Sequence, residues 1–308
     1  MNYRFSGHET FPVRYSWLPK AYQALSANPR LFADEENAMV ILGVGKNMVR
    51  AIRFWMQAAG IAQTATNNTL QVTPLGQALL ALDGHDPFLE DIRTLWLIHW
   101  NISTLTEEPL FAWHYLLNYW QQPELSRTKA VKMFAREAEQ QERRLSSVTL
   151  EQHFDVFLHT YVPTRSRKGE ILEDNLDSPL IELNLVEPRG ERETEKGGQR
   201  ETLYAFRRTP KPEIDSGLFL YCLDDFWRKH YQKEETLPFR NITVVPGSPG
   251  QIFKLPENDI RERLDTIADD SGGYFQYEES AALARVRRTN PEPHDWLGAI
   301  YQNEETHV

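Results

Sequence analysis

Five polar side chains between residues 46 and 57 could contact a nucleic acid. They are Lys46, Asn47, Arg50, Arg53 and Gln57. Four of them recur about one helical turn apart, with no acid in their stripe, and the positions between them form an apolar stripe of Val49, Ile52, Met56 and Ala59. Arg can pair with guanine and Gln with adenine in the major groove, and Lys and Asn suit phosphates. The pattern predicts a DNA-reading helix from Lys46 to Ala59; the alternative is a solvated helix face.

The segment Gly43-Val-Gly-Lys46 resembles a nucleotide-binding phosphate loop but departs from it twice. That motif needs a glycine where this chain has Val40, and Ser or Thr where it has Asn47. We therefore expect Gly45 to permit a tight turn before the helix. The first turn of the helix would still favour a phosphate, including one from DNA.

Other groups that could do chemistry are better explained as structural. Adjacent His8 and Glu9 would point to opposite sides of an extended segment, and we expect them to tether the N-terminus, for example through a Glu9 ion pair. Two acidic clusters could serve a metal-dependent nuclease, but acids at helix starts are usually caps. The clusters are Asp86, Glu90 and Asp91, and Glu173, Asp174 and Asp177. We expect no metal site, no cofactor and no catalytic activity.

A second group of basic residues could contact phosphates from the middle of the chain. It consists of Arg165, Arg167, Lys168, Arg207 and Arg208. Four glutamates between 191 and 201 offset this charge, so a solvated loop is the alternative.

The elements around the predicted reading helix follow the winged-helix order. Helices are expected over 14–25, 34–42 and 46–59, followed by strands over 61–64 and 69–72 and by a helix over 74–82. Asp34 and Thr73-Pro74 are the expected helix starts, and Gly43 and Gly60 the expected stops. Asn67 and Asn68 separate the strands and are typical of a tight hairpin, because Asn tolerates positive φ. The hairpin tip would touch the DNA backbone beside the reading helix.

Breaks in the pattern divide the chain into three segments, 1–123, 124–212 and 213–308. The middle segment repeats the helix and hairpin order more weakly, with strands at 185–187 and 202–207. In the last segment we expect an extended stretch over 236–245 and a hairpin over 273–288. The predicted fold is mostly α with α+β character, built from tandem winged-helix-like domains; a third winged helix in 213–308 stays open.

Composition and charge indicate where in the cell the protein works and which partners its segments could contact. The 308 residues carry a net charge of −10, and residues 213–308 hold most of it, which favours protein contact there over DNA contact. The single cysteine, Cys222, excludes an internal disulfide. With no apolar run of membrane length and no signal-peptide pattern, we expect a cytoplasmic protein without membrane contact.

Four stretches resemble an uncharacterised bacterial family called domain of unknown function 4007. They are His8-Glu-Thr-Phe11 with Arg14 and Trp17-Leu18; Leu42 to Trp55; Asp86 to Asp91 with Thr94 to Trp100; and Pro246 to Gly250 with Phe253 to Leu255. The resemblance implies genes beside PAPS-reductase-like and DNA phosphorothioation or defence genes. It supplies no catalytic residue.

Taken together, these features predict a non-catalytic DNA-binding accessory subunit of a DNA sulfur-modification or defence system. Its partners would be double-stranded DNA and proteins of that system, such as a PAPS-reductase-like enzyme or an ATPase docked on residues 213–308. One alternative is a protein–protein adaptor that does not bind DNA. Another is a winged-helix transcriptional regulator.

Overall fold

The computed structural model describes residues 2–65, 69–141, 144–163, 178–194, 200–280, 283–289 and 294–302. Helices dominate, with small antiparallel sheets of order β1–β2, β3–β4 and β5–β7–β6. The fold is therefore mixed α+β, as predicted, whereas the tandem winged-helix architecture is not established. The chain forms two compact units, and the predicted division at 123 and 212 stays a prediction. Unit 1 is Met1–Trp113 with Gln121–Arg207, and unit 2 is His114–Trp120 with Arg208–Val308.

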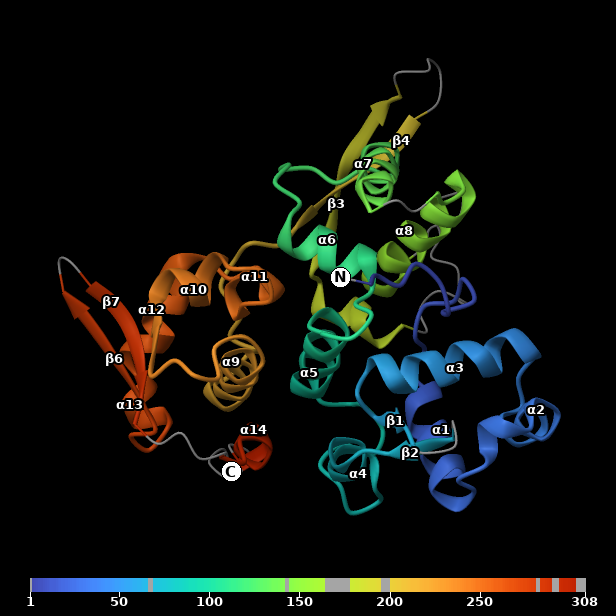
Figure 1. The fold of residues 1–308 in the computed structure, drawn as a ribbon, viewed down its shortest axis with the longest axis horizontal. Coiled ribbons are helices and arrows are strands. Elements are labelled where there is room, and N and C mark those ends of the chain that lie inside the picture. Colours follow the sequence, from blue (N-terminus) through green and yellow to red (C-terminus); the bar gives the residue numbers. More distant parts are fainter. Residues whose placement is uncertain are drawn as a thin grey trace. The chain divides into compact units, whose positions relative to one another are not determined.

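Unit 1 begins with three helices and a hairpin (Figure 1). In order they are α1 (Trp17–Ala27), α2 (Glu35–Leu42), α3 (Lys46–Ala58), β1 (Ala62–Thr64), β2 (Leu70–Val72) and α4 (Pro74–Leu80). Helix α3 packs against α1, α2 and β1. The strands pair with Ala62 opposite Val72. This order of elements is the predicted one.

Local signals set the ends of these helices. Asp34 caps α2 by accepting a hydrogen bond from the Asn37 amide at 3.1 Å. Gly43 ends α2 in the left-handed conformation, at φ 64°. Thr73 caps α4, whose first residue is Pro74. These capping residues lie next to the helix ends that they determine, so the ends could be predicted from the sequence.

Gly76 on α4 fixes how closely this helix approaches the end of α3. A Cβ at Gly76 would lie 2.3 Å from the backbone oxygen of Ile61. We expect Gly76→Ala to lower the free energy of unfolding by about 2 kcal/mol, because two backbones would have to separate. Urea unfolding followed by circular dichroism measures this. The control is Gly45→Ala. Gly45 has a negative φ of −72°, so the prediction that the turn needs a glycine there was wrong, and an added Cβ meets nothing within 4 Å. Equal losses in both variants would contradict the prediction for Gly76.

The rest of unit 1 packs around buried aromatic side chains, including Trp55, Trp96, Trp100 and Trp113. Its elements are α5 (Ile92–Ser103), α6 (Phe111–Asn118, which continues into unit 2), α7 (Arg127–Gln140), α8 (Ser147–Tyr161), η3 (Pro179–Leu183), β3 (Val186–Glu193) and β4 (Arg200–Phe206). The prediction that the first strand ends at residue 187 was wrong. The strand runs past Pro188. A register shift between Pro188 and Gly190 lets the strand continue although proline has no N–H group to donate to the neighbouring strand.

Unit 2 combines helices with a three-stranded sheet. Its elements are α9 (Ser216–His230), β5 (Thr236–Pro238), α10 (Phe239–Val244), α11 (Pro249–Phe253), α12 (Glu257–Asp265), α13 (Ile267–Asp270), β6 (Phe275–Ser280), β7 (Leu283–Arg288) and α14 (Leu297–Tyr301). The predicted hairpin is present as β6 and β7. The prediction of an extended stretch over 236–245 was wrong, because the chain becomes helical at Phe239. Burial of Phe239 and Ile242 overrides the β-propensity of this segment.

Among the described residues, no helix combines the length and the apolar character that crossing a membrane requires.

Candidate nucleic-acid interface

Helix α3 is anchored in the core of unit 1 by the predicted apolar stripe. Val49, Ile52, Met56 and Ala59 are all buried. Phe54 and Trp55 are buried as well, and the Trp55 indole donates a hydrogen bond to the Phe11 carbonyl at 3.0 Å. Phe54 therefore does not form an exposed protein-docking patch beside Arg50. The side chains of α3 that keep contact with solvent are those of Lys46, Asn47, Met48, Arg50, Arg53 and Gln57.

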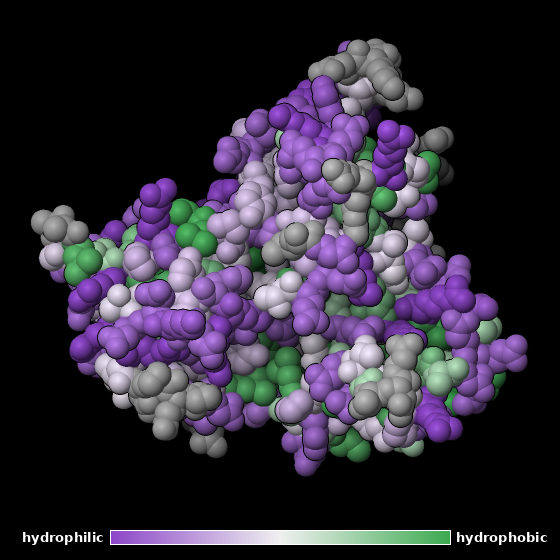
Figure 2. All heavy atoms as spheres, viewed as in Figure 1, coloured by the Kyte–Doolittle hydropathy of each residue, from purple (hydrophilic) through white to green (hydrophobic). Residues whose placement is uncertain are grey.

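The polar stripe is accessible mainly in the first half of the helix. Lys46, Asn47 and Arg50 are exposed, whereas Arg53 and Gln57 are half-buried. Figure 2 shows mostly hydrophilic residues over the region of α2 and α3, with a few apolar ones between them. The Gln57 amide donates to the Thr64 hydroxyl at 2.9 Å, which ties α3 to β1. A base contact by Gln57 would have to replace that bond.

An acidic residue from the neighbouring helix sits against the polar stripe. Glu35, at the start of α2, receives two hydrogen bonds from Arg50, at 2.7 and 3.1 Å, and an ion pair from Lys46 at 3.2 Å. Arg50, and to a lesser extent Lys46, lower the pKa of Glu35 to about 2. The stripe carries no acid in the sequence of α3, but it is partly neutralised in three dimensions.

This pairing would compete with an anionic ligand of α3, but it does not bury the cations. Exposed ion pairs contribute little stability, because water and salt screen them. A phosphate can therefore take the place of the Glu35 carboxylate on Arg50 at modest cost. Until it does, Glu35, Arg50 and Lys46 together carry a net charge of +1 instead of the +2 of the two cations alone.

Of the other predicted contact residues, the structure describes only Arg207 and Arg208. Asn67, Asn68, Arg165, Arg167 and Lys168 lie outside the described residues. In unit 1, the Arg207 guanidinium donates to the carbonyls of Leu183 and Asn184, at 3.0 and 3.2 Å, and so stabilises the end of η3. Arg208 is exposed in unit 2.

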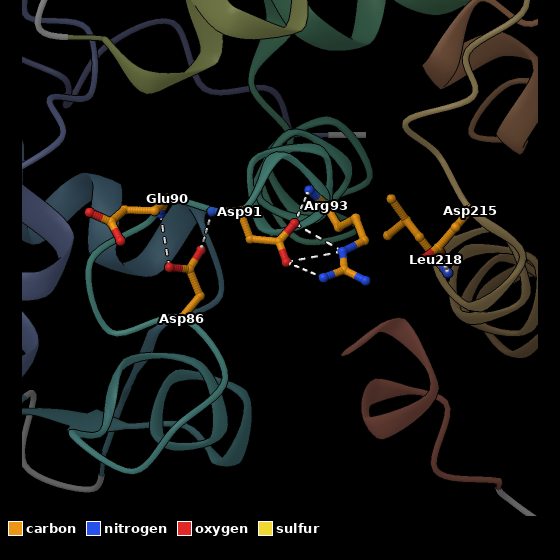
Figure 3. Close-up of polar contacts among 6 residues, drawn as sticks. All are labelled: Asp86, Glu90, Asp91, Arg93, Asp215 and Leu218. Atoms are coloured by element: carbon orange, nitrogen blue, oxygen red, sulfur yellow. Dashed lines mark hydrogen bonds and ion pairs between the residues drawn. The ribbon is translucent and has the colours of Figure 1, made fainter. Parts of the chain in front are cut away.

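In the first acidic cluster Asp91 is a helix cap, as expected, whereas Asp86 stabilises the loop before α5 (Figure 3). The two Asp86 oxygens accept from the amides of Glu90 and Asp91, at 2.9 and 3.0 Å. Asp91 caps α5 at the Arg93 amide and pairs with the Arg93 guanidinium. The second cluster, Glu173, Asp174 and Asp177, lies outside the described residues. Within the described ranges, no three His, Cys, Asp or Glu residues come together as metal ligands do.

His8 tethers the N-terminal segment, through a partner that the sequence did not show. Its Nε2 lies 3.0 Å from Nδ1 of His153 on α8, and the two rings stack at an interplanar angle of 12°. His153 Nε2 accepts a hydrogen bond from the Ala112 amide at 2.9 Å. Burial lowers the pKa of His8 to about 4 and that of His153 well below its usual value. The pair is therefore neutral and structural.

Comparison with known proteins identifies the family. The model of the family described as "Protein of unknown function (DUF4007)" matches residues 5–301. The chain belongs to the DUF4007 family. No curated protein matches this DUF4007 chain.

Two solved structures resemble this DUF4007 chain over 98% of its length. A magnesium-ion-bound SspB crystal structure has a TM-score of 0.83 and 27% sequence identity, and the match covers 88% of that chain. A second SspB crystal structure has a TM-score of 0.81 and 25% identity, again with 88% of that chain covered.

The magnesium ion in the first SspB structure raises the question of a similar site in this DUF4007 chain. Magnesium prefers carboxylate oxygens and water as ligands. The carboxylates of Asp86 and Asp91 do not fit this role, because backbone amides and Arg93 already occupy their oxygens. No magnesium-dependent step therefore follows from these residues.

Proposed function

We propose that this chain is a DNA-binding subunit of a bacterial DNA phosphorothioation or defence system, without catalytic activity of its own. Membership of DUF4007 and the likeness to SspB support the setting. The DNA-binding role is carried by one observation. Helix α3 buries its apolar residues and leaves a cationic stripe exposed, beside a hairpin, in a helix order typical of winged helices.

In the proposed complex, α3 enters the major groove. Lys46 and Asn47 contact phosphates at the N-terminal turn of the helix, where backbone amides also favour anions. Arg50 and Arg53 reach guanine edges, and Gln57 reaches adenine after leaving Thr64. The hairpin tip, Asn67 and Asn68, contacts the adjacent backbone. Unit 2, which contains the acidic 213–308 segment, takes the protein partner, a PAPS-reductase-like enzyme or an ATPase.

The test compares duplex binding of the wild type and an Arg50→Ala/Arg53→Ala variant by fluorescence anisotropy. We expect the variant to bind at least about tenfold more weakly between about 50 and 200 mM salt, with a flatter salt dependence where phosphate contacts are lost. Arg240→Ala, which removes an exposed arginine from unit 2, is the matched control. Equal affinities for all three proteins would remove α3 as the DNA contact.

The pairing of Arg50 and Lys46 with Glu35 favours a second candidate, an adaptor that joins proteins of the same system without touching DNA. Co-purification with the neighbouring gene products, together with no anisotropy change on any duplex, would support the adaptor.

Incubation with supercoiled plasmid and magnesium tests the non-catalytic part of the main proposal. Conversion to nicked circles would overturn it.

A further inference from the structure

Helix α2 carries more apolar side chains than its packing in unit 1 uses. Figure 1 shows α2 at the periphery of unit 1. The run from Ala38 to Leu42 is entirely apolar, but only Ala38 and Leu42 are buried. Val40 is 81% exposed and Ile41, next to it, is 41% exposed. Isolated exposed apolar residues are common on soluble proteins, whereas consecutive ones on a regular helix typically mark a binding surface.

A broad groove lies along this exposed side of α2. Its volume is about 1260 Å³, and Met39, Val40 and Val44 contribute its large apolar side chains. The backbone at Gly43 and Gly45 forms another part of the wall, and an added Cβ at Gly45 would meet nothing within 4 Å. The volume exceeds the roughly 300–1,000 Å³ of small-molecule pockets, so the groove suits a polypeptide segment.

The charged side chains of the groove are mainly acidic. Of the described residues that line it, three are acids and one is a lysine, which gives a formal charge of −2; they are Asp34, Glu35, Glu36 and Lys46. Glu36 is exposed and precedes Val40 by one helical turn, so both side chains lie on the same side of α2. A partner that covers Val40 therefore meets the Glu36 carboxylate beside it.

Charge and apolar surface together select the class of partner. A DNA duplex, or a membrane with anionic lipids, would bring negative charge to Asp34 and Glu36 and be repelled. A protein segment with Lys or Arg beside large apolar side chains would instead meet opposite charge. Its apolar side chains would also remove Val40 from water, which favours binding.

We propose that this groove docks a basic, amphipathic segment of a partner protein. The apolar side chains of the segment pack on Met39, Val40 and Val44, and its cations pair with the carboxylates of Asp34 and Glu36. This surface belongs to unit 1, whereas the partner surface of the proposed function belongs to unit 2. The docking does not require α3 to bind DNA.

Selection from a displayed library of random peptides tests the class of partner without assuming a partner sequence. The peptides have about 12 residues, or roughly three helical turns, and the full chain is the bait. Val40→Ser is the counter-bait, because it removes the apolar side chain while Ser and Val have similar helix propensities. We expect the peptides that bind the wild type but not Val40→Ser to be rich in Lys or Arg and in large apolar residues. Acidic Val40-dependent peptides, the same peptides on both baits, or no enriched peptide at all would overturn the proposal.

One Val40-dependent peptide, carrying a fluorescent label, then gives affinities by anisotropy. We expect Val40→Ser to weaken binding about tenfold. Leu82→Ser is the control and should change nothing, because Leu82 is also an apolar residue of unit 1 that is 81% exposed. Glu36→Lys should weaken binding at low salt, and exchanging the Lys and Arg residues of the peptide for Glu should restore it. Equal affinities in Val40→Ser and Leu82→Ser, or no effect of Glu36→Lys, would overturn the proposal.

The duplex assay separates this docking site from the DNA-binding role of α3. Val40→Ser should bind duplexes as the wild type does, whatever the result for Arg50→Ala/Arg53→Ala. If Val40→Ser weakens duplex binding and leaves peptide binding unchanged, the groove faces DNA and the docking proposal fails. Val40 and Glu36 are exposed, so both variants should keep the circular dichroism spectrum of the wild type.

Discussion

Acidification is expected to destabilise unit 1 as the pH falls from 6.5 toward 4, with His8 as a main cause. Burial lowers the pKa of His8 from 6.5 to about 4 in the folded chain. Between these values the unfolded chain binds a proton that the folded chain does not, so the free energy of unfolding rises with pH and is lost on acidification. The His8 contribution is about 3 kcal/mol by pH 4. His153 and His159 add to it, since burial lowers the pKa of each as well.

The geometry explains why neither ring of the pair accepts a proton readily. The outer nitrogen of each ring faces a backbone donor: His153 Nε2 accepts from the Ala112 amide at 2.9 Å, and His8 Nδ1 accepts from the Thr10 amide at 3.2 Å. The two inner nitrogens face each other at 3.0 Å and share one hydrogen bond. A proton added to either ring would therefore point an N–H group at another N–H group in a buried space. The charged form would therefore break the contact between the N-terminal segment and α8.

Urea unfolding at a series of pH values measures this effect. His153→Gln removes one titrating group while its side-chain oxygen can still accept from Ala112, so the unfolding free energy should depend less steeply on pH. His85→Gln, at an exposed histidine, is the control and should keep the wild-type dependence. A wild-type slope in His153→Gln would show that the pair does not account for the acid sensitivity.

The sequence predicted those parts of unit 1 that depend on neighbours a few residues apart. The period of Val49, Ile52 and Met56 identifies the buried side of α3, and Asp34, Gly43 and Thr73 mark helix ends. Each of these signals acts over one or two turns of helix. Such short-range signals are what the rules for helical periodicity and helix capping detect in a sequence.

The sequence did not reveal the contacts made across the fold. Glu35 meets Arg50 across 15 positions, and His8 meets His153 across 145. A single glutamate at a helix start reads as an ordinary first-turn acid, and nothing in its neighbourhood points to Arg50. Helix α10 and the strand through Pro188 were missed because burial and a β-bulge outweighed local propensity.

Replacing Glu35 with Gln is expected to raise DNA affinity about tenfold at low salt. The change frees Arg50 and Lys46 from their shared carboxylate and removes a negative charge from the surface that we propose contacts DNA. With a pKa of about 2, Glu35 stays ionised at any working pH, so a change of pH within that range does not release the two cations.

Glu36→Gln is the matched control, because it removes the same charge from the next residue of α2. Glu36 is exposed and forms no ion pair with the described part of the chain. The difference between the two variants therefore isolates the pairing from the general loss of negative charge. If Glu35→Gln gains no more affinity than Glu36→Gln, Arg50 and Lys46 do not contact DNA, and the adaptor accounts better for this surface.

A double-mutant cycle with Arg50→Ala completes the argument. If Glu35 acts by occupying Arg50, most of the gain from Glu35→Gln should disappear when Arg50 is absent, leaving only the part that Lys46 contributes. If the gain is unchanged in the Arg50→Ala background, Glu35 acts through the overall field and not through the pair. The cycle thus distinguishes two roles of Arg50: binding a DNA phosphate, or holding α2 against α3 through the ion pair with Glu35.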